Sequence, residues 1–317
     1  MFSVKFNLEK SILIDKPISE VFETVSNFAS WPTWSPWLIQ EPDCPITITN
    51  KAGTIGHGQS WQGKDIGSGI IAIKHIQANQ QIDYDLCFLK PWKSKSNTSF
   101  TFKEIEGQTQ ITWTMQSTLP IFMFWMKKMM IALIGSDYDR GLSMLKDLCE
   151  TGLVHSQLDI QKQKSKDEFY YVGIERECST AQIGYIMSKD LKTLHDLIEN
   201  NTLEKPINVI AIYKKFDMVN DRCEFVSAIT YDKKVEISDK DLSKELITGH
   251  VAKHTSCIVS HKGEYKHLGN AWSKAMGYLR GNKIKQAKLI APYEVYLNDP
   301  ATTEQKDLIT EVNFPLQ

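Results

Sequence analysis

A glutamate in an aromatic stretch is the feature of this sequence that most clearly points to chemistry. Glu294 lies in the run Pro292-Tyr293-Glu294-Val295-Tyr296, whose alternation predicts a strand. Side chains of a strand point alternately to its two faces, so Pro292, Glu294 and Tyr296 share one face. On that face Glu294 is either the floor of a pocket or a charge exposed to solvent, which is the commoner position of a glutamate. In a pocket, partial burial would raise its pKa, and aromatic faces would help to hold a cationic ligand.

Aromatic side chains of the C-terminal half are candidates for the wall of such a pocket. They are Tyr265, Trp272, Tyr293 and Tyr296, with Tyr185 and Tyr213 as the counterparts from an earlier segment. The helical spacing around Trp272 fits simple core packing equally well. In a catalytic version of the site, Glu294 would act as general base on a water and Tyr265 or Tyr296 as acid, provided that both lie within about 3 Å of the reacting atoms.

The strand that carries Glu294 belongs to a unit that the C-terminal half contains twice. Ile210–Lys214 aligns with Ile290–Glu294; a strand and an amphipathic helix precede each block, and an alternating strand follows it. The strands are expected at 170–177 and 223–230 in the first copy and at 255–262 and 308–316 in the second. Lys214 then takes the place of Glu294 in the first copy. Two such halves usually meet at a cleft, so we expect the site at their seam.

The N-terminal half has the pattern of a sheet-rich domain. Its apolar residues predict a first strand over 4–14, a helix that begins after Pro17, successive strands over 46–117 and a long helix from about Pro120 to Glu150. This order is typical of an antiparallel sheet curved around one helix. Three tryptophans accompany two prolines in 31–37, and we expect an irregular loop that displays their rings.

A second candidate site would lie between this sheet and its long helix. Trp34, Trp37, Trp61, Tyr84 and Trp113 could line a cavity there. Apolar cavities with few polar groups are what many small-molecule sites look like. For any one of these residues, packing in a filled core is the more common role.

Length and composition limit the remaining possibilities. The 317 residues suggest two domains, which we place at 1–150 and 169–317, with the polar segment 151–168 as linker. A formal net charge of −1 argues against direct nucleic-acid binding. The N-terminus shows no apolar leader, and the apolar run 119–134 contains Lys127 and Lys128 and is too short to span a bilayer. We therefore expect a cytoplasmic chain without membrane insertion.

Cysteine and histidine spacing indicates no metal site. The six cysteines are scattered, without a C-x-x-C pair, and are expected to be reduced. His250 and His254 are four residues apart, but Gly249 beside them indicates the end of a helix, and no third ligand is evident. The glycines between 53 and 69 lack the spacing of a phosphate loop. We expect neither a metal nor a cofactor.

Residues 1–150 resemble the SRPBCC superfamily, whose members are also described as START-like or polyketide-cyclase-like. The matching stretches are Lys16–Phe22, Trp31–Trp37, Gly58–Trp61 and Asp139–Lys146. The resemblance implies an α+β fold in which a curved antiparallel sheet grips a long C-terminal helix. Because the superfamily includes binders, lipid carriers and cyclases, it does not identify a ligand.

Residues 169–317 resemble the GyrI-like domain, the effector-binding module behind the DNA-binding heads of many bacterial multidrug regulators. The matching stretches are His261–Tyr265, Leu268 with Trp272, Pro292–Tyr296 and Leu308–Leu316. The resemblance implies a duplicated strand-helix-strand-strand fold in which Glu294 lies at the floor of an aromatic pocket and meets cationic or polar ligands. An SRPBCC-like domain stands here in place of the DNA-binding head, which puts direct transcriptional regulation in doubt.

These features support two functions from different classes. In the first, the chain is a non-enzymatic binder of small amphipathic organic molecules, cationic ones among them, and works alone, as a homodimer or with a separate regulatory protein. In the second, it is a hydrolase or cyclase that acts on reactive hydrophobic molecules, with Glu294 as general base. We favour binding, because no complete catalytic constellation accompanies Glu294.

Overall fold

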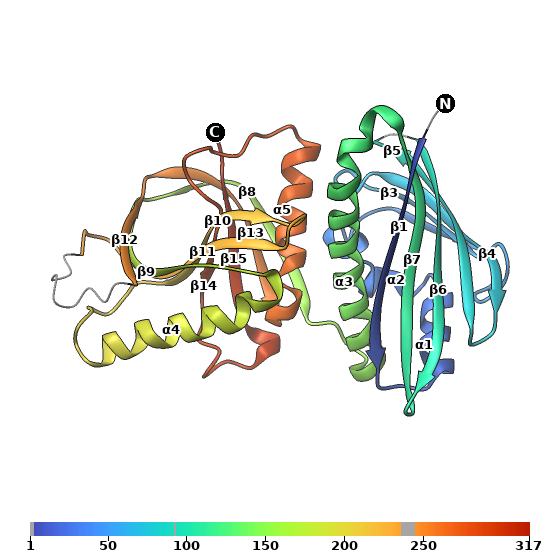
Figure 1. The fold of residues 1–317 in the computed structure, drawn as a ribbon, viewed down its shortest axis with the longest axis horizontal. Helices are drawn as coiled ribbons and strands as arrows, with labels where there is room; N and C mark the ends of the chain where they lie inside the picture. Colours follow the sequence, from blue (N-terminus) through green and yellow to red (C-terminus); the bar gives the residue numbers. More distant parts are fainter. Residues whose placement is uncertain (1–2, 92, 236–244) are drawn as a thin grey trace. The chain divides into compact units, whose positions relative to one another are not determined.

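A computed structural model describes residues 3–91, 93–235 and 245–317, and the chain divides into two compact units, Met1–His155 and Ser156–Gln317 (Figure 1). Each unit has its own antiparallel sheet and its own helices. The α+β class predicted from the sequence is therefore confirmed. Among the described residues, no helix is both long and apolar enough to cross a membrane.

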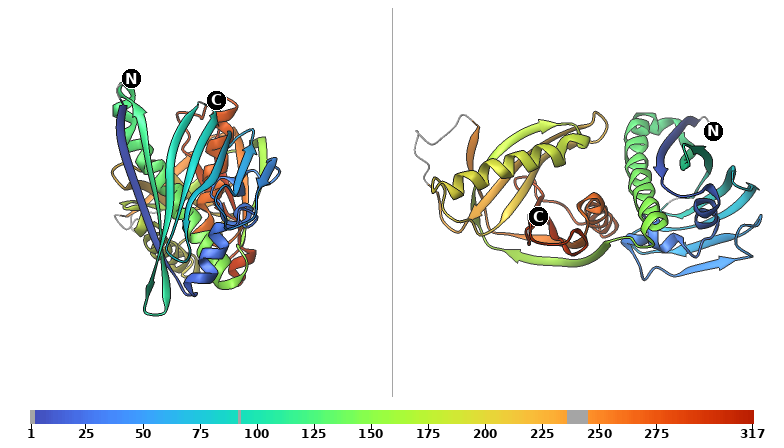
Figure 2. Two further views of the ribbon diagram at one scale, coloured as in Figure 1. Left: turned by 90° about the vertical axis from the view of Figure 1, so that its right-hand side faces the viewer. Right: turned by 90° about the horizontal axis from the view of Figure 1, so that it is seen from below.

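The N-terminal unit is a seven-stranded antiparallel sheet that curves around one long helix (Figures 1 and 2). Its strand order is β1-β7-β6-β5-β4-β3-β2. In chain order its elements are β1 (Ser3–Ile14), α1 (Ile18–Ser26), α2 (Trp31–Trp34), η1 (Leu38–Gln40), β2 (Ile46–Thr49), β3 (Gly58–Gln62), β4 (Ser68–Gln77), β5 (Gln81–Lys90), β6 (Ser94–Ile105), β7 (Gln108–Pro120), η2 (Ile121–Met126) and α3 (Lys127–Thr151).

The core of this unit is filled with aromatic rings. Trp113 of β7 stacks on Tyr138 of α3, with ring centroids 3.8 Å apart, and on Phe100 of β6 at 4.7 Å. The alternation of β7 turns Ile111, Trp113 and Met115 to the same buried face. The strands and the helix are thus held together by large buried side chains, which contribute most of the stabilisation of such a unit.

The tryptophan-rich segment differs from the expected irregular loop. Trp31–Trp34 forms a one-turn helix, with Pro32 in its first turn, where the missing N–H of proline costs no hydrogen bond. Trp31 and Trp34 are 3% and 0% exposed. The prolines therefore end the helix early without pushing the rings into solvent, and the predicted display of these rings was wrong.

The C-terminal unit is an eight-stranded antiparallel sheet with two longer helices. Its strand order is β12-β9-β11-β10-β14-β15-β13-β8. In chain order its elements are β8 (Ser156–Lys166), β9 (Phe169–Cys178), η3 (Thr180–Gln182), α4 (Ile183–Glu199), β10 (Val209–Asp217), β11 (Arg222–Tyr231), β12 (Leu246–Val251), β13 (His254–Gly263), η4 (Tyr265–His267), α5 (Gly269–Gly281), β14 (Tyr293–Tyr296), η5 (Gln305–Asp307) and β15 (Ile309–Pro315).

The predicted duplication is visible in this strand order. The succession β9-β11-β10 of the first copy is mirrored by β14-β15-β13 of the second, and the copies join where β10 pairs with β14. Each copy also contributes a leading strand to the other: β8 pairs with β13, and β12 pairs with β9. Each copy is therefore a strand-strand-helix-strand-strand unit whose first strand is exchanged.

Most of the segment expected as a linker is one of these exchanged strands. Residues 156–166 form β8, in which Leu158 and Ile160 pack against the apolar cluster beside α5. The glutamines and lysines around them gave the segment its polar composition. Because β8 is the last strand of the sheet, it has one unpaired edge, where polar and charged side chains are common. The boundary between the units thus lies at residue 155 rather than at 168.

Candidate ligand-binding site

Glu294 lies in the middle of the C-terminal sheet, next to the seam between the two copies. Its strand β14 pairs with β10 on one side, where Ala211 is opposite Glu294, and with β15 on the other, where Val312 is opposite. Only 2% of Glu294 is exposed. Side chains of a strand point out of the sheet, so the carboxylate is buried by the side chains that cover this face of β14, among them Trp272 of α5 and Tyr213 of β10.

Three aromatic donors hold this carboxylate. The Tyr213 hydroxyl donates to Oε2 of Glu294 over 2.9 Å, and the Tyr296 hydroxyl donates to the same oxygen over 2.6 Å. The Trp272 indole N–H donates to Oε1 over 2.5 Å. These donors come from β10, β14 and α5, so both copies of the duplicated unit supply the site.

Burial raises the pKa of Glu294, and the hydrogen bonds from Tyr296, Trp272 and Tyr213 oppose this effect. Among the described residues, no cation contributes to the shift. Burial, with the nearby charge of Glu294 second, also raises the pKa of Tyr213 and of Tyr296 well above the usual value, so both hydroxyls stay protonated donors. The site therefore holds a carboxylate that accepts three hydrogen bonds but whose charge is balanced by no basic side chain in the described part of the chain.

The site is not closed on all sides. Tyr296 and Trp272 are partly exposed, and Tyr265 at η4 is 37% exposed. The rings of Tyr265 and Tyr296 meet edge to face, with centroids 5.7 Å apart. The rings of Tyr213 and Trp272 also meet edge to face, at 4.9 Å. Tyr213 with Trp272 and Tyr265 with Tyr296 thus form two ring pairs, and three of these four side chains donate a hydrogen bond to Glu294; we call the four the aromatic wall.

Two candidates of the proposed wall lie elsewhere. Tyr293 is on the opposite face of β14, since neighbouring side chains of a strand alternate, and its hydroxyl lies 3.2 Å from Nε2 of His254. Tyr185 of α4 is 66% exposed, and the ammonium of Lys189 lies over its ring at 4.3 Å. Among the described residues, neither side chain forms a hydrogen bond with Glu294, whose donors are Tyr213, Trp272 and Tyr296.

Met187 of α4 belongs to the site and was not singled out in the sequence. Its sulfur lies 3.1 Å from the Tyr296 hydroxyl oxygen, whose single proton is donated to Glu294, and Met187 packs in the same cluster as Tyr213 and Phe225. The helical rhythm of α4 shows only that Met187 faces the sheet. That it meets Tyr296 depends on where the helix crosses the sheet, which no local pattern reveals.

Lys214, the sequence counterpart of Glu294, has a different environment. It is exposed and forms an ion pair with Glu175 over 2.7 Å. A register shift between Tyr213 and Lys215 interrupts the pairing of β10 with β11 at this position. The pseudo-symmetry of the fold therefore does not extend to a second carboxylate or to a buried lysine.

The tryptophans proposed for an N-terminal cavity are mostly packed on protein. Trp34 and Trp113 are 0% and 1% exposed and lie among other rings. Trp37 is partly buried and donates from its indole N–H to Asp137 over 3.0 Å. Trp61 is partly buried against Phe88, and its ring occupies the space that a Cβ at residue 69 would need.

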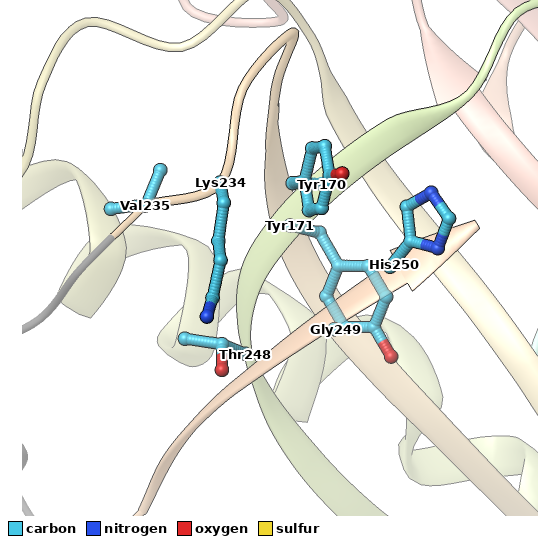
Figure 3. Close-up of a pocket in the computed structure, with 7 residues that line it drawn as sticks. All are labelled: Tyr170, Tyr171, Lys234, Val235, Thr248, Gly249 and His250. Atoms are coloured by element: carbon cyan, nitrogen blue, oxygen red, sulfur yellow. The ribbon is translucent and has the colours of Figure 1, made fainter. Parts of the chain in front are cut away.

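A shallow pocket of about 200 Å³ lies on β9 and β12, away from Glu294 (Figure 3). Its lining includes Tyr170, Tyr171, Gly249 and His250. Gly249 lies within strand β12, not at a helix end as expected, and the ring of Tyr171 occupies the space that its side chain would fill. The described residues form no group of metal-binding side chains here or elsewhere.

Comparison with known families assigns each half of the chain. Residues 5–150 match the family described as polyketide cyclase / dehydrase and lipid transport. Residues 162–317 match the GyrI-like small molecule binding domain. The chain thus joins an SRPBCC-like N-terminal domain to a GyrI-like C-terminal domain, as the sequence motifs predicted, and these matches support small-molecule binding as its general function.

Several solved structures are similar to parts of the chain. EcmrR in its complex with DNA shares 17% identity over 62% of this chain and 72% of its own, with a TM-score of 0.40. SAV2435 bound to tetraphenylphosphonium shares 15% over 50% and 94%, with a TM-score of 0.38. The Aha1 dimer from Colwellia psychrerythraea shares 19% over 46% and 98%, with a TM-score of 0.36. No curated protein matches the chain.

Proposed function

We propose that the chain binds small amphipathic organic cations, with Glu294 as the anionic anchor and Tyr213, Trp272, Tyr265 and Tyr296 as the aromatic wall. The observation that carries the proposal is the buried carboxylate, which has no basic partner among residues 3–91, 93–235 and 245–317. Keeping a charge out of water is costly unless an opposite charge approaches it. A ligand with an apolar body and a positive centre would provide that charge while its body packs on the aromatic rings.

The same geometry favours binding over general-base catalysis. Both oxygens of Glu294 already accept hydrogen bonds from side-chain donors. These donors oppose the rise of its pKa that burial causes, and they already use acceptor positions that a base needs in order to take a proton from water. An electrophilic substrate would have to displace Tyr296 or Tyr213 before Glu294 could activate a water.

Ligand affinity is expected to depend on pH through Glu294. The pKa of Glu294 lies above the ordinary glutamate value of 4.5, mainly because of burial. Protonation removes the charge that attracts the cation, so affinity for the dye ethidium should be highest at the alkaline end of the range. It should fall as pH drops through a midpoint above that ordinary value. A fluorescence titration of ethidium between about pH 4 and pH 8 measures this midpoint.

The other titratable groups beside Glu294 stay neutral over that range. Burial raises the pKa of Tyr265 and that of Cys223 to about 12, and Tyr213 and Tyr296 are raised further. Glu294→Gln serves as the control, since its residual affinity should not change over the same pH range. A midpoint at or below the ordinary glutamate value, or the same pH profile in the glutamine variant, would count against Glu294 as the anchor.

A further inference from the structure

One end of the N-terminal unit carries an exposed apolar tip that the ligand site does not use. The tip consists of η2 and the first turn of α3: Ile121 is 51% exposed, Phe122 67%, Phe124 63%, Trp125 69% and Met129 46%. Large apolar side chains that stand singly in solvent are common, but five within nine residues are not. Such a contiguous patch is characteristic of a surface that another apolar phase covers.

Three chain segments meet at this end of the sheet. The register pairs Ser3 with Pro120, so the start of β1 lies beside the end of β7, immediately before the tip. The end of β5 and the start of β6 lie at the same end, because Phe88 pairs with Ser94, and β6 in turn pairs with β7. Figure 1 shows the start of β1 at this end, near the start of α3.

The charges around the tip all have the same sign. The three segments, 3–8, 86–97 and 115–131, contain six lysines and no aspartate or glutamate, although the whole chain carries a formal net charge of −1. The lysines are Lys5, Lys90, Lys93, Lys95, Lys127 and Lys128. None of them forms an ion pair within the described residues, whereas lysines elsewhere, such as Lys10 and Lys146, do.

We propose that this end of the N-terminal unit docks peripherally on an anionic lipid bilayer, with the tip inserted at the headgroup level and the lysines on the lipid phosphates and carboxylates. Tryptophan and phenylalanine suit the boundary between headgroups and acyl chains, and lysine stems reach from it to the charged surface. An apolar tip alone would fit any hydrophobic partner. The lysines around it are all positively charged and therefore favour an anionic surface, since each lysine near such a membrane adds to the attraction.

Vesicle co-sedimentation of the full chain tests the proposal. Vesicles that contain phosphatidylserine in phosphatidylcholine should retain the chain at least about tenfold better than phosphatidylcholine alone, and high salt should remove the difference. Phe124→Ser with Trp125→Ser should lower retention on the anionic vesicles by about tenfold or more, because the inserted apolar area is lost. Lys127→Gln with Lys128→Gln should weaken retention on these vesicles only.

Matched surface variants serve as controls. Leu289→Ser removes a side chain that is 97% exposed in the other unit, and Lys51→Gln with Lys103→Gln removes two exposed lysines outside the three segments. Both should sediment like the parent chain. Equal retention on neutral and anionic vesicles, or no retention on either, would overturn the proposal. A parent dimer that Phe124→Ser with Trp125→Ser converts to a monomer, without lipid binding, would assign the tip to a second copy of the chain instead.

Discussion

Glu294→Gln is expected to weaken the binding of ethidium to the full chain by about 2 kcal/mol or more, which is at least about 30-fold in Kd. Glutamine keeps the size of the side chain. Its carbonyl oxygen can accept from Trp272, and its NH2 group can donate to the hydroxyl oxygens of Tyr213 and Tyr296 once those hydroxyls rotate, so the charge is the main property removed. The attraction between that charge and the cation is strong because the carboxylate is 2% exposed and water screens it little. Fluorescence titration at neutral pH measures the change.

Two controls, one variant and one neutral ligand, test whether the loss of affinity is due to the charge of Glu294. Glu311→Gln changes a carboxylate on the adjacent strand β15, where Glu311 is opposite Val295 and faces away from the ligand site, and it should leave Kd unchanged. The neutral apolar dye N-phenyl-1-naphthylamine should bind the parent chain and the Glu294→Gln variant equally. An unchanged Kd for ethidium in Glu294→Gln, or an equal loss for both dyes, would exclude the charge of Glu294 as the anchor.

Loss of folding does not account for the expected effect. Because burial raises the pKa of Glu294 above its unfolded value, its contribution to stability is present below that unfolded value and is lost as pH rises through the folded pKa. Above that unfolded value, burial of the side chain therefore costs stability, and glutamine, which does not ionise, removes this cost. The thermal midpoint of Glu294→Gln should equal or exceed that of the parent chain at pH 7, as is common where a site is built at the expense of stability.

The same variant separates binding from catalysis. A binder returns its ligand unchanged, so prolonged incubation of a reactive epoxide or ester with the parent chain should yield no product. Turnover that Glu294→Gln abolishes while ligand binding persists would instead support the hydrolase. The distance of 2.6 Å between the Tyr296 hydroxyl and Oε2 makes Tyr296→Phe a useful second variant, because a catalytic acid would be lost there but the anchor charge would remain.

Local patterns predicted the elements of the fold well. The alternation around Val172 and Ile174 and the helical rhythm from Ile183 to Ile198 follow directly from burial of one face, which is a local property. Glu294, Tyr265, Trp272, Tyr213 and Tyr296 were also named from the sequence, and in the structure they lie together. These residues could be named because they lie in stretches that resemble the GyrI-like domain; amino-acid composition alone does not identify them.

The errors concern residues whose position depends on tertiary contacts rather than on the local sequence pattern. Tyr293 was grouped with Glu294 although adjacent strand residues face opposite sides, so its proximity in sequence was misleading. Residues 156–166 were predicted to be a linker, because nothing local indicates that Leu158 and Ile160 pair with a strand about 100 residues away. Met187 was missed for the same reason, since its contact with Tyr296 depends on the position of α4 over the sheet.

The second large expected effect is a loss of stability in the N-terminal unit. Trp113→Ala is expected to lower the free energy of unfolding of this unit by about 3–5 kcal/mol, which is a large part of the 5–15 kcal/mol that a typical domain possesses. The substitution removes stacking on Tyr138 and Phe100 and leaves Thr98 without the indole N–H that it accepts at 2.9 Å. Urea unfolding followed by circular dichroism measures the loss.

Trp125→Ala is the matched control, since Trp125 is 69% exposed and its removal should change stability by less than about 0.5 kcal/mol. The outcome also decides between the two roles considered for the N-terminal tryptophans. A side chain that lines an open cavity is only partly packed, so its removal would cost little stability and would alter the binding of an apolar probe. A core side chain behaves in the opposite way: Trp113→Ala should destabilise the N-terminal unit while ethidium binding at Glu294 persists, because each unit has its own hydrophobic core.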